Sequence, residues 1–217
     1  MISAPDRRLR FDPRALGLEP APRVFFRRAT VVVARGLIGA WFARFHRGIW
    51  HGGRIVETEA YLGPGDAAAH SWRWRRTPRV EPMYRDGGTL YVFFVYGMHS
   101  CANVVTRPPE DPQAVLLRAA EGPDGAPVRL LSGPGRLCSA LGVTVEASGL
   151  DLVAGARFRI FLPRRRRVSV GISPRIGVDY AGEAAAWPLR FFDRASPAVS
   201  GPKSGVQNPG SKRDKLP

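Results

Sequence analysis

The chain has 217 residues, which is enough for one hydrophobic core, and nothing in the sequence requires a second. Its 33 Lys and Arg residues outnumber its 18 Asp and Glu residues, which gives a formal net charge of +15. The expected partner is therefore a polyanion, with nucleic acid ahead of acidic lipid. The two cysteines, Cys101 and Cys138, form no C-x-x-C pair. The sequence thus predicts no zinc site or iron–sulfur cluster, and reduced thiols in an intracellular protein.

The two ends of the chain differ from its middle. Residues 1–22 mix Arg, Asp and Pro without a period, which predicts a flexible or irregular N-terminal arm and not a signal sequence. Residues 201–217 are rich in Gly, Ser, Pro and Lys, which predicts a disordered basic tail. Residues 23–200 are expected to form one domain. Its best apolar run, residues 30–45, is interrupted by arginines, so no membrane span is expected.

The first predicted elements lie between residues 23 and 61. Apolar residues within residues 23–45 fit a helix that begins near Thr30, followed by a strand around residues 40–45. The glycines of residues 48–53 predict a turn that leads into a strand over residues 54–61.

Two glutamates in that strand are not explained by its apolar pattern. Side chains alternate between the faces of a strand, so Glu57, Glu59 and Tyr61 are expected to share one face. A buried acid is costly unless it is paired or takes part in chemistry, and a neighbouring aromatic ring suits a planar ligand. The alternative is an edge strand whose glutamates face water.

A basic and aromatic loop follows the strand. The Gly-Pro-Gly-Asp of residues 63–66 ends the strand shortly before His70, and residues 71–79 contain Trp72 and Trp74 among arginines and a proline. This mixture suits contact with phosphate and stacking on sugar or base. The alternative is a solvated loop whose tryptophans pack into the core. The arginines of the loop are Arg73, Arg75, Arg76 and Arg79.

The strongest predicted strand, residues 89–96, forms a hairpin with a second strand over residues 100–106. Tyr96 would then lie near an exposed tip. An aromatic tip on a basic protein can wedge between bases, although it can also cover a neighbouring loop.

The rest of the chain predicts further short elements. Residues 114–119 form a buried strand near whose end Arg118 either pairs with a glutamate or points to water. Residues 132–135 precede a helix that starts near Arg136, and the missing Gly-Lys-Ser/Thr excludes a P-loop. Other predicted strands lie within residues 150–162, 175–178 and 188–192.

Five separated blocks of the sequence match the motifs of one enzyme family. They are Arg-Ile-Val-Glu-Thr-Glu-Ala-Tyr-Leu-Gly-Pro with Ala-His-Ser (54–71), Gly-Thr-Leu-Tyr-Val with Tyr-Gly-Met (88–98), Val-Leu-Leu-Arg-Ala (115–119), Gly-Pro with Leu-Cys (133–138), and Arg-Ile-Gly-Val with Ala-Gly-Glu and Pro-Leu-Arg-Phe (175–191). In these blocks, which extend over most of residues 23–200, the chain resembles the alkyladenine (3-methyladenine) DNA glycosylases of the mammalian type. That family removes damaged purines from duplex DNA.

The resemblance implies a role for individual residues. Glu59 matches the general base that activates the water attacking C1′ of the deoxyribose, and Arg118 matches the arginine that helps position water and carboxylate. The resemblance also implies a substrate pocket lined by Tyr61, His70, Phe93, Asn103 and Leu116. In this pocket Tyr61 would stack on the flipped base, and Asn103 would exclude the 2-amino group of guanine. The resemblance implies DNA contacts by Tyr96, which fills the gap in the duplex, and by Met98, Arg75 and Arg76.

The resemblance further implies an α+β class: a single compact domain with a curved, largely antiparallel sheet, flanking helices and a protruding β-hairpin. It implies a monomer, intracellular and associated with DNA, that acts on alkylated or deaminated purines in double-stranded DNA without a metal or other cofactor. Because no lysine precedes Lys203, we expect a monofunctional enzyme without lyase activity.

Departures from the family pattern leave alternatives open. Phe93 and His99 replace common aromatic residues of the family, and the segment between Arg118 and Gly133 is shorter than usual. A DNA-binding relative with little or no turnover is therefore one alternative. Another is a carbohydrate hydrolase that uses Glu57 and Glu59 as its pair of acids.

Overall fold

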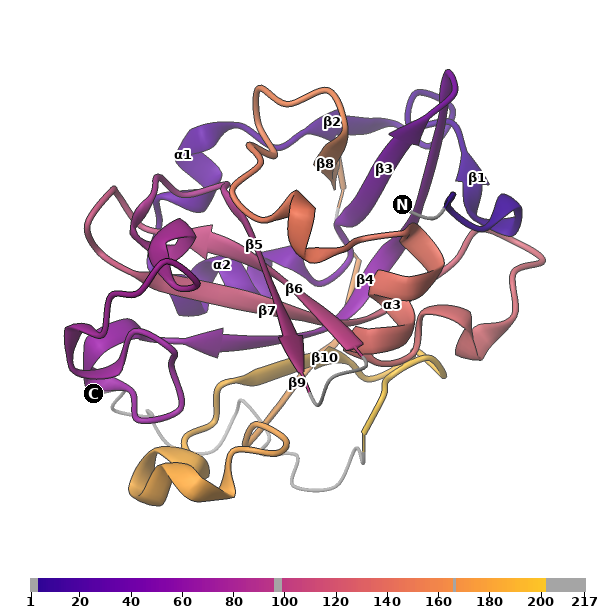
Figure 1. The fold of residues 1–217 in the computed structure, drawn as a ribbon. Helices are drawn as coiled ribbons and strands as arrows, with labels where there is room; N and C mark the ends of the chain where they lie inside the picture. The colour runs from indigo at the N-terminus through magenta and orange to yellow at the C-terminus, as the bar shows by residue number, and fades with distance from the viewer. Residues whose placement is uncertain (1–3, 96–98, 166, 202–217) are drawn as a thin grey trace.

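The computed structural model describes residues 4–95, 99–165 and 167–201, and within them ten strands form one sheet (Figure 1). The strands are β1 (Arg10–Phe11), β2 (Leu18–Pro20), β3 (Trp41–His46), β4 (Ile49–Tyr61), β5 (Leu90–Val95), β6 (His99–Thr106), β7 (Gln113–Glu121), β8 (Phe158–Pro163), β9 (Val170–Ser173) and β10 (Arg190–Asp193). The main path runs β2-β8-β3-β4-β7-β6-β5; β1 and β10 also pair with β4, and β9 pairs with β10. Every pair is antiparallel, which confirms the predicted α+β class.

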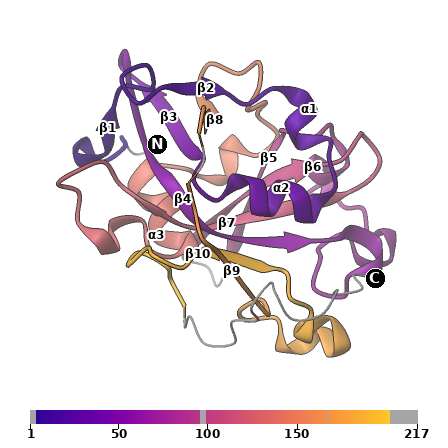
Figure 2. The same ribbon diagram turned by 180° about the vertical axis from the view of Figure 1, so that it is seen from behind.

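Helices cover the sheet. Those of the described residues are α1 (Arg23–Phe26), α2 (Thr30–Leu37) and α3 (Pro134–Leu141), together with seven 3₁₀ helices. Helix α2 lies across β4 and β7 (Figure 2), where the Thr58 hydroxyl donates to the Ala34 carbonyl at 3.0 Å. Helix α3 packs on β6 and β7, begins with a proline and ends at Leu141. Gly142 then caps the helix, and its φ of 60° suits a glycine. The Thr58 face of β4 is thus the core face, so the other face is left for a site.

The central strand β4 is longer than the sequence predicted. Residues 48–53 were expected to form a turn, but β4 begins at Ile49 and pairs with β3 from there. A Cβ on Gly52 would lie 2.5 Å from the Phe42 carbonyl oxygen, and one on Gly53 would lie 2.6 Å from the Glu121 carbonyl oxygen. These glycines therefore let neighbouring strands approach closely, and they do not mark a turn.

Residues 4–22 differ from the expected flexible or irregular arm. Strand β1 pairs with β4 and β2 pairs with β8, so this segment belongs to the sheet. Leu9, Leu18 and Ala21 are buried in the domain. The strands have only two and three residues, too few for a period that sequence analysis could detect.

The predicted hairpin is present as β5 and β6, which pair from Leu90 with Val104 to Val95 with His99. The proposed tip residues Tyr96 and Met98 lie outside the described residues, as do residues 202–217 of the expected tail. Among the helices of the described residues, none is both long enough and apolar enough to cross a membrane.

Candidate active site

The two glutamates of β4 lie inside the sheet. Residues 57–59 of β4 pair with β7 along one edge and with β10 along the other, so this part of β4 is not an edge strand. Glu57 and Glu59 are both 0% exposed, which excludes the alternative of glutamates that face water. They lie on the same side of β4 as Tyr61, whose hydroxyl donates to Glu59 Oε2 at 3.0 Å.

Arg118 joins the two carboxylates. Pairing between β4 and β7 shifts register near Glu57, and Arg118 is the extra residue of β7 between Leu117 and Ala119. Its Nε donates to Glu57 Oε1 at 3.0 Å, and its Nη1 lies 3.2 Å from Glu59 Oε1. Of the two predicted positions for Arg118, paired with a glutamate or pointing to water, the structure shows the paired one.

Glu57 is held on all sides by donors. Besides Arg118, it accepts from Arg190 Nε at 2.7 Å and from the Ser200 backbone N–H at 2.6 Å. Burial raises the pKa of Glu57. The positive charges of Arg118 and Arg190 and the Ser200 hydrogen bond lower it by more than burial raises it, so the pKa lies below the ordinary value. Glu57 is therefore an ionised structural group, held by three donors.

Glu59 has a different environment from Glu57. Its Oε1 accepts from the Ile176 backbone N–H at 2.8 Å and faces Arg118, and its Oε2 accepts from Tyr61. Burial raises the pKa of Glu59 above its ordinary value, and Arg118 opposes that shift only in part. The two acids thus have pKa values shifted in opposite directions, which is a common mark of a reactive carboxylate beside a structural one.

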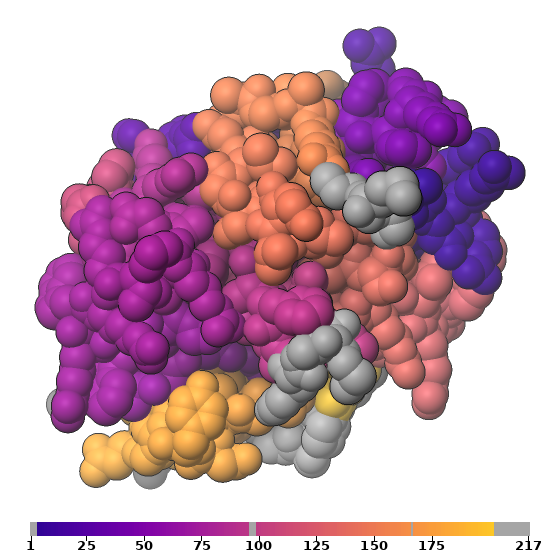
Figure 3. Space-filling model, in the orientation of Figure 1, coloured from indigo at the N-terminus to yellow at the C-terminus, as the bar shows by residue number. Residues whose placement is uncertain are grey.

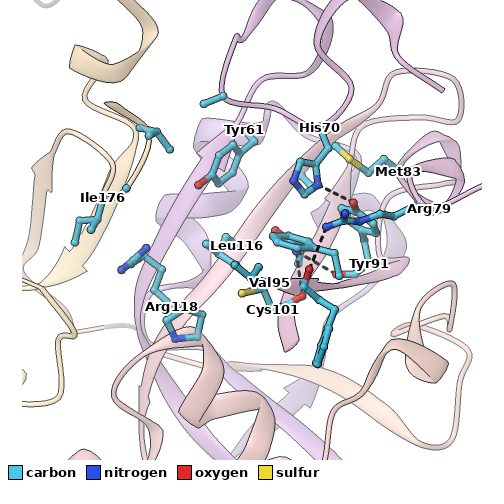
Figure 4. Close-up of a pocket in the computed structure, with 18 of the residues that line it drawn as sticks. Tyr61, His70, Arg79, Met83, Tyr91, Val95, Cys101, Leu116, Arg118 and Ile176 are labelled. Atoms are coloured by element: carbon cyan, nitrogen blue, oxygen red, sulfur yellow. Dashed lines mark hydrogen bonds between the residues drawn. The ribbon is translucent and has the colours of Figure 1, made fainter. Parts of the chain in front are cut away.

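A pocket of about 530 Å³ opens beside this cluster. Tyr61, Leu116, Arg118 and Ile176 form one side of it, and His70, Tyr91 and Arg79 lie across from them (Figure 4). Its volume is within the range of about 300–1,000 Å³ that small-molecule sites occupy. Glu59 lies behind this wall, in contact with three of the residues that line it. The predicted residues Phe93 and Asn103 also line the pocket, together with Met83, Phe94, Cys101, Pro134, Val178 and Tyr180.

The wall opposite Tyr61 is aromatic. The His70 ring lies 4.4 Å from the Phe93 ring at 72°, and His70 Nδ1 lies 2.7 Å from the Tyr91 hydroxyl. Burial, aided by Arg79 and Arg75, lowers the pKa of His70 to about 4, so the ring is neutral at pH 7.

Arg175 and Asp66 support the Tyr61 ring, and sequence analysis did not predict this pair. The Arg175 guanidinium lies 4.8 Å from the centre of the Tyr61 ring. It forms a fully buried ion pair with Asp66 and donates to the Ala60 carbonyl at 3.0 Å. Asp66, which belongs to the Gly-Pro-Gly-Asp that ends the strand, also accepts from the Ala68 backbone N–H at 3.0 Å. The sequence carries no local signal for a pair between residues 109 positions apart.

The residues predicted to contact DNA are only partly described. Tyr96 and Met98 fall outside the described residues. Arg75 and Arg76 lie on the surface of the segment that follows β4, which Figure 3 shows beside the β5–β6 strands, across from the segment around residues 176–190. Arg76 is paired with Glu81 at 2.8 Å and with Glu110 at 2.6 Å, so its charge is already compensated.

Comparison with known proteins identifies the family. The sequence model of the family described as "Methylpurine-DNA glycosylase (MPG)" matches residues 24–197. The chain is 42% identical over 197 residues to a protein of Desulfitobacterium hafniense (strain Y51), covering 82% of this chain and 97% of the relative. It is 40% identical over 201 residues to a protein of Bacillus thuringiensis (strain Al Hakam), covering 83% of this chain and 98% of the relative. Both relatives carry the name "Putative 3-methyladenine DNA glycosylase". The chain therefore belongs to the methylpurine-DNA glycosylase family.

Proposed function

We propose that the protein is a DNA repair glycosylase that binds duplex DNA as a monomer, takes a damaged purine into the pocket and hydrolyses its N-glycosidic bond. Glu59 activates the water, Arg118 positions the water and the carboxylate, and Tyr61 stacks on the extruded base. The product is an abasic site. Family membership and the names of the relatives support the glycosylase activity, and the roles of the residues are our proposal.

The observation that carries the proposal is the hydrogen bonding of Glu59. An ionised carboxylate offers about four lone-pair positions. Among the described residues, three groups occupy such positions: Arg118 and the Ile176 N–H at Oε1, and the Tyr61 hydroxyl at Oε2. One position on Oε2 therefore remains to accept a proton from water. We place that water on the pocket side, where Tyr61, Arg118 and Ile176 lie.

The chemistry follows from this arrangement. As the bond between C1′ and the purine nitrogen breaks, its electron pair leaves with the base and positive charge develops on the sugar. The Glu59 carboxylate stabilises that charge and takes a proton from the water whose oxygen bonds to C1′. A purine alkylated at N3 or N7 is cationic, so it leaves as a neutral base without further protonation.

The pair of acids does not suit a carbohydrate hydrolase. Such enzymes place two carboxylates on either side of the scissile bond. Glu57 already accepts hydrogen bonds from Arg118, Arg190 and the Ser200 N–H, so its oxygens are not free to serve as the second carboxylate.

The test is release of free base from a duplex with a single 3-methyladenine or 7-methylguanine, compared between the wild type and Glu59→Gln. Loss of the general base should slow release about 100- to 10,000-fold. Binding to a duplex that carries a tetrahydrofuran abasic analogue should be retained, because Gln keeps the size of the side chain.

The matched control is Glu19→Gln, the same chemical change at an exposed residue of β2 that forms an ion pair with exposed Arg164. It should release base at the wild-type rate. An unchanged rate in Glu59→Gln would reject the catalytic assignment. Binding without base release by the wild type would instead favour a relative that has lost turnover.

A further inference from the structure

The segment between two pocket-lining residues has an unusual backbone. His70 and Arg79 both line the pocket, so the loop between them lies at its rim. Within this loop Arg73 has φ 54° and Trp74 has φ 61°. Bulky residues rarely adopt the left-handed region, and two in succession persist only where the surroundings hold them. Such strain is concentrated at functional sites.

Arg76 holds one end of this loop. Its guanidinium binds Glu81 at 2.8 Å and Glu110 at 2.6 Å, and it lies 4.3 Å from the centre of the Tyr84 ring. A guanidinium with two carboxylates and an aromatic partner is fixed in position, and its charge is compensated. Arg76 therefore anchors the loop in this structure, and the DNA contact that the resemblance implies for it stays a prediction.

Further contacts fix the loop at both ends. Ser71 is 0% exposed and its hydroxyl donates to the Pro112 carbonyl at 2.7 Å. The Tyr84 hydroxyl donates to the Arg75 carbonyl at 3.1 Å. The loop is thus held before and after its strained residues, and it presents its side chains on a fixed backbone.

The side chains so presented are aromatic and basic. Trp72 is 41% exposed and Trp74 is 64% exposed. The Arg73 guanidinium lies 4.3 Å from the centre of the Trp72 ring, and exposed Arg75 follows. Within residues 4–95, 99–165 and 167–201, Arg73 and Arg75 form no ion pair with an acid. Exposed aromatic planes beside such guanidiniums match the chemistry of a nucleic acid strand, whose bases and sugars stack and whose phosphates attract cations.

We propose that Trp72 and Trp74 form a stacking surface for the DNA strand next to the extruded nucleotide. The inference rests on the proposed function, because the loop borders the pocket that would receive the damaged base. A DNA partner fits the net charge of +15 and the continuity of the loop with the pocket through His70 and Arg79. At this left-handed position the Trp74 side chain is 64% exposed, so its ring is accessible to a ligand.

Trp74→Gly tests this surface without weakening the fold. Glycine adopts positive φ at no steric cost, so the variant should melt at the wild-type temperature or above it. Base–aromatic stacking is worth about 1–3 kcal/mol per base, so the dissociation constant for a duplex with a tetrahydrofuran site should rise about 5- to 150-fold. Fluorescence anisotropy of labelled DNA measures it. The control is Phe45→Ala, which removes a ring that is 40% exposed on β3, outside the pocket, and should leave binding unchanged.

Trp74→Phe gives a second measurement that does not depend on the glycine variant. Phenylalanine keeps a stacking ring, so binding should remain near the wild-type level. Part of the DNA-induced quenching of tryptophan fluorescence should nevertheless disappear, because the stacked indole is gone.

The outcomes separate this inference from the proposed function. Unchanged DNA affinity in a folded Trp74→Gly variant, or unchanged quenching in Trp74→Phe, would overturn the stacking surface. If either of these results is found while the wild type releases damaged bases, only the stacking surface is rejected and the glycosylase activity stands. Weakened binding in Trp74→Gly together with a wild type that releases no base would support the surface and reject the glycosylase activity.

Discussion

Replacing Glu57 by glutamine removes one charge from a cluster in which two carboxylates balance two guanidiniums. Glu57 and Glu59 are 0% exposed, and the side chains of Arg190 and Arg118 are 1% and 11% exposed. In Glu57→Gln the amide oxygen can still accept from both arginines. The amide nitrogen then faces the Ser200 N–H, which donates to Glu57 Oε2 at 2.6 Å in the wild type, so one hydrogen bond is replaced by a contact between two donors.

The magnitude follows from burial. Removing one partner of a buried ion pair costs about 3–5 kcal/mol, because the remaining charge is left uncompensated. Glutamine keeps two hydrogen bonds, so we expect a loss near the lower end, about 3 kcal/mol. For a protein of this size that corresponds to a melting temperature lower by about 6–12 °C. Thermal melting and urea denaturation at pH 7 measure both quantities.

The pH dependence provides a second test of the same reasoning. The folded pKa of Glu57 lies below its ordinary value of 4.5, so the ionised side chain stabilises the fold above pH 4.5. This contribution is lost as the pH falls through the lower folded pKa, where wild-type Glu57 becomes neutral like glutamine. The melting temperatures of the two proteins should therefore converge in acid. Equal melting temperatures at pH 7, or a difference that persists at low pH, would refute the assignment of Glu57 as an ionised structural group.

Two further predictions use other features of the site. His70 has a folded pKa of about 4 against an ordinary value of 6.5, so the unfolded chain binds a proton between these values that the folded protein does not. Its contribution to stability should be lost as the pH falls from 6.5 to 4, and urea denaturation of His70→Gln should show less of this acid loss than the wild type. Because no lysine precedes Lys203, borohydride should trap no covalent complex with abasic DNA. A robust trapped species would show that the enzyme also acts as a lyase.

The part of the site that depends on strand alternation was predictable. The pattern of residues 54–61 placed Glu57, Glu59 and Tyr61 on one face, and the structure shows the Tyr61–Glu59 hydrogen bond that results. The β5–β6 hairpin and helix α3 were predicted for similar reasons, since each has a local period and a turn or cap signal.

The parts that depend on distant segments were not predictable from local patterns. The Ile176 N–H that binds Glu59 is a backbone group 117 residues away, and no side-chain type identifies it. Arg190 reaches Glu57 because β10 pairs with β4, and such a pairing of a four-residue strand has no local signature. The same reason explains why residues 4–22 were expected to be an arm: their strands gain their stability from partners elsewhere in the chain.

The position of Glu59 behind the pocket wall bears on how the site would favour the transition state over the substrate. In the structure its charge is compensated by Arg118 and by donors from Tyr61 and Ile176, so it offers little net attraction to a neutral sugar. Interactions that strengthen only as charge develops accelerate the reaction, whereas uniform attraction of the substrate does not. Positive charge appears on the sugar carbon as the base departs, and a carboxylate already held in place responds to it without reorganisation. The raised pKa of Glu59 also favours stabilisation of the transition state over the substrate. Burial makes the ionised form of Glu59 costly in the resting protein, and a developing cation nearby would relieve that cost.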